Sequence, residues 1–153
     1  MDVAKLCVQL YKQYDSTYDI FAKSERDQFE EFMRPLPDLY IRTNRKDENG
    51  QPVHYQLEVV AAGTFTWMLK KRINAHQEWF DENNDEDWGF EDSYPNLLLV
   101  CDNKSTEKRI HRLVGGKYMD FETWTTTRER LASGGKKIWV QYYDEDEMEY
   151  LAI

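Results

Sequence analysis

Two carboxylates lie on two neighbouring segments of this chain that are otherwise apolar. Asp38 opens a β-rich segment at residues 38–43, and Glu58 lies within a second one at residues 53–60. Hard oxygen ligands from adjacent strands are a common way to present Mg²⁺ to a phosphate group. The spacing therefore indicates a Mg²⁺ site in which Asp38 and Glu58 are the metal ligands and the catalytic carboxylates.

The turn between these two segments decides whether both carboxylates share one face of a sheet. A two-residue turn at Asn49 and Gly50 would send them to opposite faces, because a shift of one residue reverses every side chain of a strand. A three-residue loop at residues 48–50, with Gly50 in the left-handed conformation and a bulge, would keep Asp38 and Glu58 on one face. We favour the three-residue loop.

The clearest helix is predicted over residues 64–81, where apolar residues recur at helical spacing. Arg72 and His76 fall in the middle of its apolar stripe, so both are expected to face the sheet. An arginine in such a stripe needs an anion, which would be Glu58 or a phosphate. Arg72 and the adjacent Lys71 are therefore candidate phosphate or DNA contacts, and His76 would support Glu58.

A second interpretation of the same residues needs no metal. Asp38 would cap the turn after Pro37, and Glu58 would form a buried ion pair with Arg72 or His76. A carboxylate that faces a helix with an arginine at its centre has a positive partner with or without a metal ion. The residue pattern therefore leaves both interpretations open.

The remaining elements indicate an α/β fold. Helices are predicted over residues 2–13 and 24–33, and Pro35 and Pro37 end the second one. The apolar run at residues 97–101 predicts a strand buried on both faces, which makes the preceding helix a parallel crossover. Four smaller elements follow: a helix over about 104–113, a strand at 118–124, a helix that Thr126 and Glu129 open with a capping box, and a strand at 138–142.

This order of elements predicts a mixed sheet built from one β-hairpin and parallel crossovers. At 153 residues the chain is long enough for one domain with a real core, so residues 1–153 are expected to form a single α/β domain. Within it, an N-terminal helical segment at residues 1–35 would lead into a core at residues 37–143.

Composition narrows the classes of function. No apolar run approaches the roughly 20 residues of a membrane helix, and the first residues lack the order of a secretory signal, so we expect a cytoplasmic protein without membrane contact. Cys7 and Cys101 lack metal-type spacing and are interpreted as small buried hydrophobes. Residues 81–92 only faintly echo a calcium loop, and a solvated loop is the default interpretation there.

The net charge of −9 indicates an alternative function, because an acidic chain is suited to binding a basic partner. Acids concentrate at residues 81–87 and 144–147, whereas residues 70–72 and 104–112 are locally basic. The alternative is a non-catalytic, acidic interaction protein, which would bind a basic protein partner or imitate nucleic acid through these acids and the loop around Trp88. A local basic face would favour DNA instead.

The combination of a helix, a strand opened by Pro37 and Asp38, a strand with Glu58, a long helix and a buried strand resembles the restriction-endonuclease-like fold. Its loose signature is proline-aspartate followed by acid-x-lysine, written PD-(D/E)XK. Pro37 and Asp38 match the first half and Glu58 matches the acid of the second half, but Val60 stands where the family has its lysine. In that family the two carboxylates hold Mg²⁺ and the lysine positions or activates the attacking water.

Within this broad fold the chain looks most like the plasmid replication-relaxation proteins of mobile elements. The likeness is carried by residues 37–41, 57–59, 69–72, 94–112, 125–127 and 129–131. It implies a nuclease-like domain that acts in plasmid DNA replication or mobilisation, with DNA or a protein of the DNA-processing machinery as its partner. Because Val60 cannot replace the lysine, it also implies a degenerate metal site, with charge supplied by Arg72 or Lys71.

Overall fold

The computed structural model describes residues 3–13, 19–22, 37–82, 95–115, 119–141, 143, 146 and 148–153. Its helices are α1 (Val3–Gln13), α3 (Thr66–Glu82), α4 (Lys104–Val114) and α5 (Arg128–Ala132), and its strands are β1 (Asp19–Ala22), β2 (Leu39–Lys46), β3 (Pro52–Val60), β4 (Asn96–Cys101) and β5 (Thr123–Thr127). The helix predicted over residues 24–33 lies outside the described residues. None of the described helices has the length and apolar character needed to cross a membrane.

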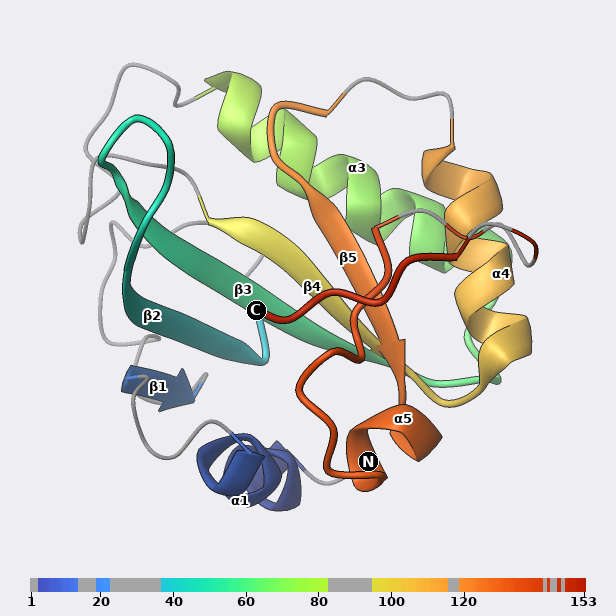
Figure 1. The fold of residues 1–153 in the computed structure, drawn as a ribbon. Coiled ribbons are helices and arrows are strands. Elements are labelled where there is room, and N and C mark those ends of the chain that lie inside the picture. Colours follow the sequence, from blue (N-terminus) through green and yellow to red (C-terminus); the bar gives the residue numbers. More distant parts are fainter. Residues whose placement is uncertain are drawn as a thin grey trace.

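All five strands form one sheet in the order β1-β2-β3-β4-β5 (Figure 1). The pairs β1–β2 and β2–β3 are antiparallel, and the pairs β3–β4 and β4–β5 are parallel. Parallel neighbours need a crossover, and α3 and α4 supply the two that are required here. The predicted α/β class is therefore confirmed, together with its mixed sheet of one hairpin and parallel crossovers.

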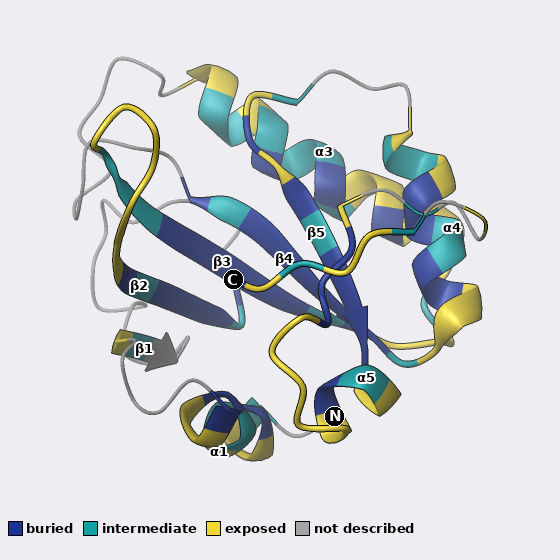
Figure 2. Cartoon of the chain, in the orientation of Figure 1, coloured by how far each residue is buried: buried dark blue, intermediate teal, exposed yellow. Residues whose placement is uncertain are grey.

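Helices cover both faces of this sheet. α3 and α4 lie on one face, whereas α1, α5 and the C-terminal segment lie on the other (Figure 1). β4 is buried on both sides, as predicted, because Leu97 and Leu99 enter the core under α3 and α4 while Leu98 and Val100 enter the opposite core. Figure 2 shows the resulting pattern, with central strands buried and the outer surfaces of the helices exposed.

The loop between β2 and β3 is the three-residue loop that the sequence favours. The Asp47 amide donates to the Gln51 carbonyl at 2.8 Å, and the Gly50 amide donates to the Asp47 carbonyl at 3.0 Å. Gly50 has a φ of 75°, which is the left-handed conformation expected of it. Residues 48–50 thus form the loop, and the two-residue turn is excluded.

The pairing of β2 with β3 also shifts between the loop and the far end of the hairpin. Lys46 pairs with Pro52 next to the loop, but Arg42 pairs with His54, so β2 has three residues between these pairs where β3 has one. An irregularity of this kind is a bulge, and a shift by two residues leaves each side chain on its original face. The predicted arrangement of both carboxylates on one face is therefore confirmed.

Replacing Gly50 with Ala should lower the free energy of unfolding by about 1 kcal/mol, because a side chain at positive φ is strained. A Cβ at Gly50 meets no atom within 4 Å, so the cost is purely that of the backbone conformation. Gly63→Ala is the matched control, since Gly63 is equally open and has no positive φ. Urea denaturation measures both, and equal stabilities for the two variants would contradict the strain.

Two predictions near the ends of the chain are wrong. β1 lies inside the segment predicted to be helical, and it pairs with β2 through residues 19–22. Four residues are too few for a period to be read, and the free edge of β2 supplies the partner. At the other end, Val140 and Trp139 form isolated bridges with Thr125 and Leu151 where a strand at 138–142 was predicted.

The segment around β5 also differs from its prediction. The strand predicted at 118–124 forms instead at Thr123–Thr127, where all five residues pair with β4. The capping residue of α5 is Thr127, whose side chain accepts from the Arg130 amide, and it is not Thr126. Thr126 is held in the sheet and donates to the Ile138 carbonyl at 2.8 Å, so strand pairing prevails over the local capping pattern.

Candidate functional site

Two groups of polar side chains lie on the face of the sheet that α3 and α4 cover, and the second group also includes Arg130, which reaches it from α5. We call the first the Glu58 cluster, which consists of Asp38, Glu58, Arg72 and His76. We call the second the Glu107 cluster, which consists of Glu107, His111, Thr125 and Arg130. The first brings together residues that the sequence predicts as a site, and the second was not predicted.

The Glu58 cluster is built on β3. Glu58 pairs in register with Leu99 of β4, and its side chain is only 6% exposed. Side chains alternate along a strand, so Glu58 shares its face with Val60, which packs in the core under α3. A carboxylate in this position is surrounded by apolar residues and must find its partners on α3.

Arg72 and His76 of α3 provide those partners. They are four residues apart and so lie on the same face of the helix. Arg72 Nε donates to Glu58 Oε1 at 2.7 Å, and Arg72 Nη2 contacts the same oxygen. His76 Nε2 lies 3.3 Å from Glu58 Oε1, at ion-pair distance. The interpretation in which Glu58 forms a buried ion pair with residues of this helix is confirmed.

Opposing effects set the charge of Glu58. Burial by itself raises the pKa of this carboxyl, but contacts with His76 and Arg72 lower it by more, so the pKa lies below its ordinary value. His76 is fully buried, and neither of its ring nitrogens makes a hydrogen bond to a described residue. Glu58 therefore stays ionised between His76 and Arg72, and Arg72 Nε donates a hydrogen bond to it.

Asp38 lies opposite Glu58 across the hairpin. It precedes Leu39, which pairs with Leu57, so the register places Asp38 beside Glu58 on the neighbouring strand. Asp38 Oδ2 accepts the Val59 amide at 2.9 Å. The carboxylate thus binds the backbone of the adjacent strand, and not the turn after Pro37 that it was expected to cap. Burial lowers the pKa of Arg72, but Glu58 and the charge of Asp38 raise it by more.

As arranged, the Glu58 cluster is an ion pair and fits a cation poorly. One Asp38 oxygen is used by the Val59 amide, and the Glu58 oxygen that faces α3 is used by Arg72. A Mg²⁺ ion at these two carboxylates would lie close to a guanidinium that carries a permanent positive charge. Among the described residues, no group of three or more His, Cys, Asp or Glu side chains forms a metal site. Mg²⁺ binding stays a prediction.

Lys71 lies apart from this cluster. Its side chain is exposed, and it lines a hollow on the outer surface of α3 together with Trp67. The structure therefore separates the two predicted phosphate contacts: Arg72 faces Glu58, and Lys71 faces solvent.

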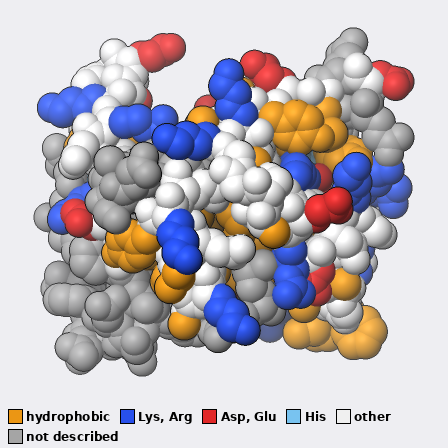
Figure 3. Space-filling view, turned by 60° about the horizontal axis from the view of Figure 1, so that its bottom comes forward, with side chains coloured by type: hydrophobic (Ala, Val, Ile, Leu, Met, Phe, Trp, Pro, Cys, Tyr) orange, Lys and Arg blue, Asp and Glu red, His pale blue; other side chains and the backbone are white. Residues whose placement is uncertain are grey.

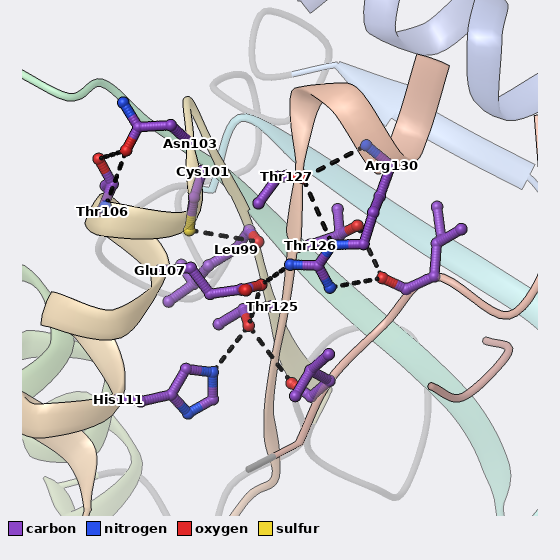
Figure 4. A network of polar contacts seen from close by, with 12 residues as sticks. Leu99, Cys101, Asn103, Thr106, Glu107, His111, Thr125, Thr126, Thr127 and Arg130 are labelled. Atoms are coloured by element: carbon purple, nitrogen blue, oxygen red, sulfur yellow. Dashed lines mark hydrogen bonds and ion pairs between the residues drawn. The ribbon is translucent and has the colours of Figure 1, made fainter. Parts of the chain in front are cut away.

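The Glu107 cluster lies between α4, β5 and α5 (Figure 4). Glu107 is fully buried, and its Oε2 contacts Arg130 Nη2 and accepts the Thr125 hydroxyl at 2.8 Å. Thr125 Oγ1 also lies 2.8 Å from His111 Nε2. Because Thr125 gives its hydrogen to Glu107, its oxygen is the acceptor for a proton on His111 Nε2. Arg130 further donates to the Ile138 carbonyl at 3.1 Å.

This cluster joins four segments into one buried network. The pKa of His111 lies below its ordinary value, because burial disfavours the charged ring, as does Arg130, while Glu107 acts in the opposite sense. Glu107 Oε1 has no hydrogen-bond partner in the part of the chain that is described. With its carboxylate closed off from solvent, the network is suited to holding α4 and α5 on the sheet.

Helical spacing is the signal that would have revealed these residues. Glu107 and His111 are four apart and flank Ile110, so the apolar face predicted for this helix carries both of them inward. The partner Arg130 had no such signal, because it lies on a five-residue helix with its own capping pattern.

Cys101 agrees with its prediction and Cys7 differs slightly. Cys101 is fully buried, and burial raises the pKa of its thiol well above the ordinary value, with Glu107 adding to the effect. Cys7 is half-buried against the α1 side of the core. The acidic stretch from 83 to 94, with Trp88 and the calcium-like pattern, lies outside the described residues, as do 144, 145 and 147.

Comparison with protein-family models, with curated proteins and with solved structures finds no match to this chain.

Proposed function

We propose that this chain is a nuclease-like domain of restriction-endonuclease-like architecture that binds DNA without cleaving it, in plasmid DNA replication or mobilisation like the replication-relaxation proteins. One observation carries the non-cleaving form: Arg72 Nε lies 2.7 Å from Glu58 Oε1, so a guanidinium occupies the carboxylate that would hold a metal. Glu58 is thereby neutralised from within the chain.

The order of elements supports the architecture. Asp38 stands directly before β2, Glu58 lies in β3, α3 follows as a crossover, and β4 pairs parallel to β3. These are the elements on which the resemblance rests, and the hairpin register puts the two carboxylates side by side. The architecture thus explains why both acids lie on one face under a helix.

The chemistry of the cluster argues against hydrolysis. Val60 is buried in the core and cannot position a water molecule. Arg72 cannot act as a general base, because its guanidinium does not lose a proton in proteins. The four residues of the Glu58 cluster therefore supply charge balance and a rigid joint between β3 and α3, and neither Val60 nor Arg72 replaces the activating lysine of the family.

Cations on the two helices support binding to DNA. We define the α3–α4 basic face by six exposed or half-exposed residues: Lys70, Lys71, Lys104, Lys108, Arg109 and Arg112. No acid lies between residues 66 and 75 of α3, and the one acid of α4, Glu107, is buried against Arg130. A chain of net charge −9 thus presents a local positive surface, which phosphate contacts require.

Mg²⁺ titration followed by heteronuclear NMR tests the metal part of the proposal. At millimolar Mg²⁺ we expect no saturable shifts at Asp38, Glu58 or Arg72, and no cleavage of plasmid DNA. Glu58→Gln is the informative variant, and Glu129→Gln is its matched control, because Glu129 is an exposed acid on α5. Metal-dependent cleavage that Glu58→Gln abolishes and Glu129→Gln retains would overturn the non-cleaving form.

Binding is tested in the same samples. We expect fluorescence anisotropy to show association with labelled DNA that weakens as salt is raised, because released counterions drive phosphate binding. Absence of binding to both duplex and single-stranded DNA at low salt would refute the proposed function as a whole.

A further inference from the structure

We propose that the outer surface of the first half of α3 binds single-stranded DNA, with Trp67 as the stacking residue and Lys70 and Lys71 as phosphate contacts. This inference deepens the proposed function and rests on it. The surface is a hollow of about 410 Å³, which we call the Trp67 hollow and define by its lining residues: Trp67, Lys70, Lys71, Asn74, Ala75 and Glu78.

Helical spacing gathers these residues on one side of α3. Residues three and four apart share a helix face, so Trp67, Lys71 and Asn74 follow one another along the helix. The opposite side of α3 carries Leu69 and Ile73 into the core. The helix is therefore anchored by one face and presents the other to solvent as a rigid support.

Large apolar side chains are unusually exposed at the start of this helix. Phe65 is 65% exposed, Trp67 66% and Met68 45%. In the view of Figure 3, hydrophobic side chains project at the lower right edge of a face over which Lys and Arg side chains are spread. Exposed aromatic rings next to cations are typical of surfaces that stack bases and neutralise phosphates.

Charge identifies the kind of occupant. Lys70 and Lys71 lie next to Trp67, and Glu78, the only acid among the described residues that line the hollow, lies at its far end. An anionic ligand with flat aromatic groups fits this distribution, and nucleic acid combines both features. A single strand fits better than a duplex, because its bases are free to stack on a protein ring whereas those of a duplex stack on one another.

Further cations of the α3–α4 basic face lie on α4, next to the segment that leads into α3. Arg109 of α4 donates to the carbonyl of Ala62 at 3.2 Å, which ties the segment before α3 to α4. Arg109 and Arg112 line a second hollow of about 220 Å³ next to Ala62. A strand that stacks on Trp67 thus has further cations on the neighbouring helix along which its phosphates can run.

Fluorescence anisotropy with a labelled oligothymidylate of about 20 nucleotides, longer than a typical site of ~4–16 nucleotides, tests the inference. Trp67→Ala should weaken binding about tenfold, since base stacking on one aromatic side chain has an effect of this order, and Trp67→Phe should retain most of the affinity. Lys70→Gln with Lys71→Gln should lower the salt slope of binding by about 0.7 for each phosphate that the protein no longer neutralises.

Matched controls lie on α1, across the sheet. Tyr11→Ala removes an exposed aromatic ring, and Lys5→Gln with Lys12→Gln removes two exposed charges. We expect both to leave the affinity unchanged.

Single-stranded DNA binding that is not affected by Trp67→Ala, or a preference for duplex DNA of the same length, would overturn the inference while leaving the proposed function intact. Loss of self-association in Trp67→Ala on a sizing column, without loss of DNA binding, would assign the hollow to a second copy of the chain and also overturn it.

Discussion

Arg130→Met is expected to lower the free energy of unfolding by about 3–5 kcal/mol, the range found when one partner of a buried ion pair is removed. The substitution leaves the fully buried carboxylate of Glu107 without its counter-charge. It also removes the donor to the Ile138 carbonyl. Urea denaturation at neutral pH measures the loss.

Arg128→Met is the matched control for Arg130→Met. Arg128 is two residues away on the same helix and pairs with Asp102, but its side chain is 51% exposed. An exposed pair contributes about 0–1 kcal/mol, so this variant should be close to wild type. Similar losses in the two variants would contradict the role assigned to the buried network.

A double variant separates the buried charge from the change in packing. Glu107→Met combined with Arg130→Met replaces both charges with apolar chains of similar length, and such replacements are often close to neutral. We expect the double variant to be more stable than Arg130→Met alone. If adding Glu107→Met instead lowers the stability further, the cost of Arg130→Met does not come from an uncompensated carboxylate.

Arg72→Met is expected to lower the free energy of unfolding by about 2 kcal/mol at neutral pH, because it removes a charged hydrogen-bond partner from the buried Glu58. The effect is smaller than that of Arg130→Met because the Arg72 side chain is 42% exposed, so solvent screens the pair. Arg42→Met is the control, since Arg42 pairs with Asp19 at 2.9 Å in an exposed position of the same sheet.

Acid should reduce the difference in stability between wild type and Arg72→Met. In wild type the pKa of Glu58 lies below its ordinary value of 4.5, so its contribution to stability is full above that pH and is lost as pH falls through the folded-state pKa. Without Arg72, one of the two groups that lower this pKa is gone, so Glu58 takes up its proton at a higher pH than in wild type. The stability gap between the two proteins should therefore narrow as pH falls from 7 to about 4. A gap that is constant over this range would contradict the assigned pairing.

Local patterns along the chain were sufficient for a large part of the fold. The helical period over residues 64–81 placed Arg72 and His76 toward the sheet, and the continuous apolar run at 97–101 indicated a strand buried on both faces. Turn chemistry at Gly50 settled the face on which Asp38 and Glu58 lie. Each of these features depends on residues within a single helix, strand or chain turn. The spacing of residues along the chain is therefore enough to predict them.

Tertiary contacts decided how the predicted site is used. The register shift in the hairpin places Asp38 directly across from Glu58, and the Val59 amide then takes one of its oxygens. Two interpretations of the carboxylates stood open in the sequence, with Arg72 available to either. The distance between Arg72 and Glu58, which belong to different elements, separates them, and no spacing along the chain contains that distance.

The Glu107 cluster shows the same division. Helical spacing directs Glu107 and His111 inward from the sequence alone, but their partners Thr125 and Arg130 come from elements that are 14 and 23 residues away. The sequence thus determines which side chains must be buried. Only the packing of α4 and α5 on the sheet determines which charges meet, because burial of an ion requires a partner in space and not a neighbour in the chain.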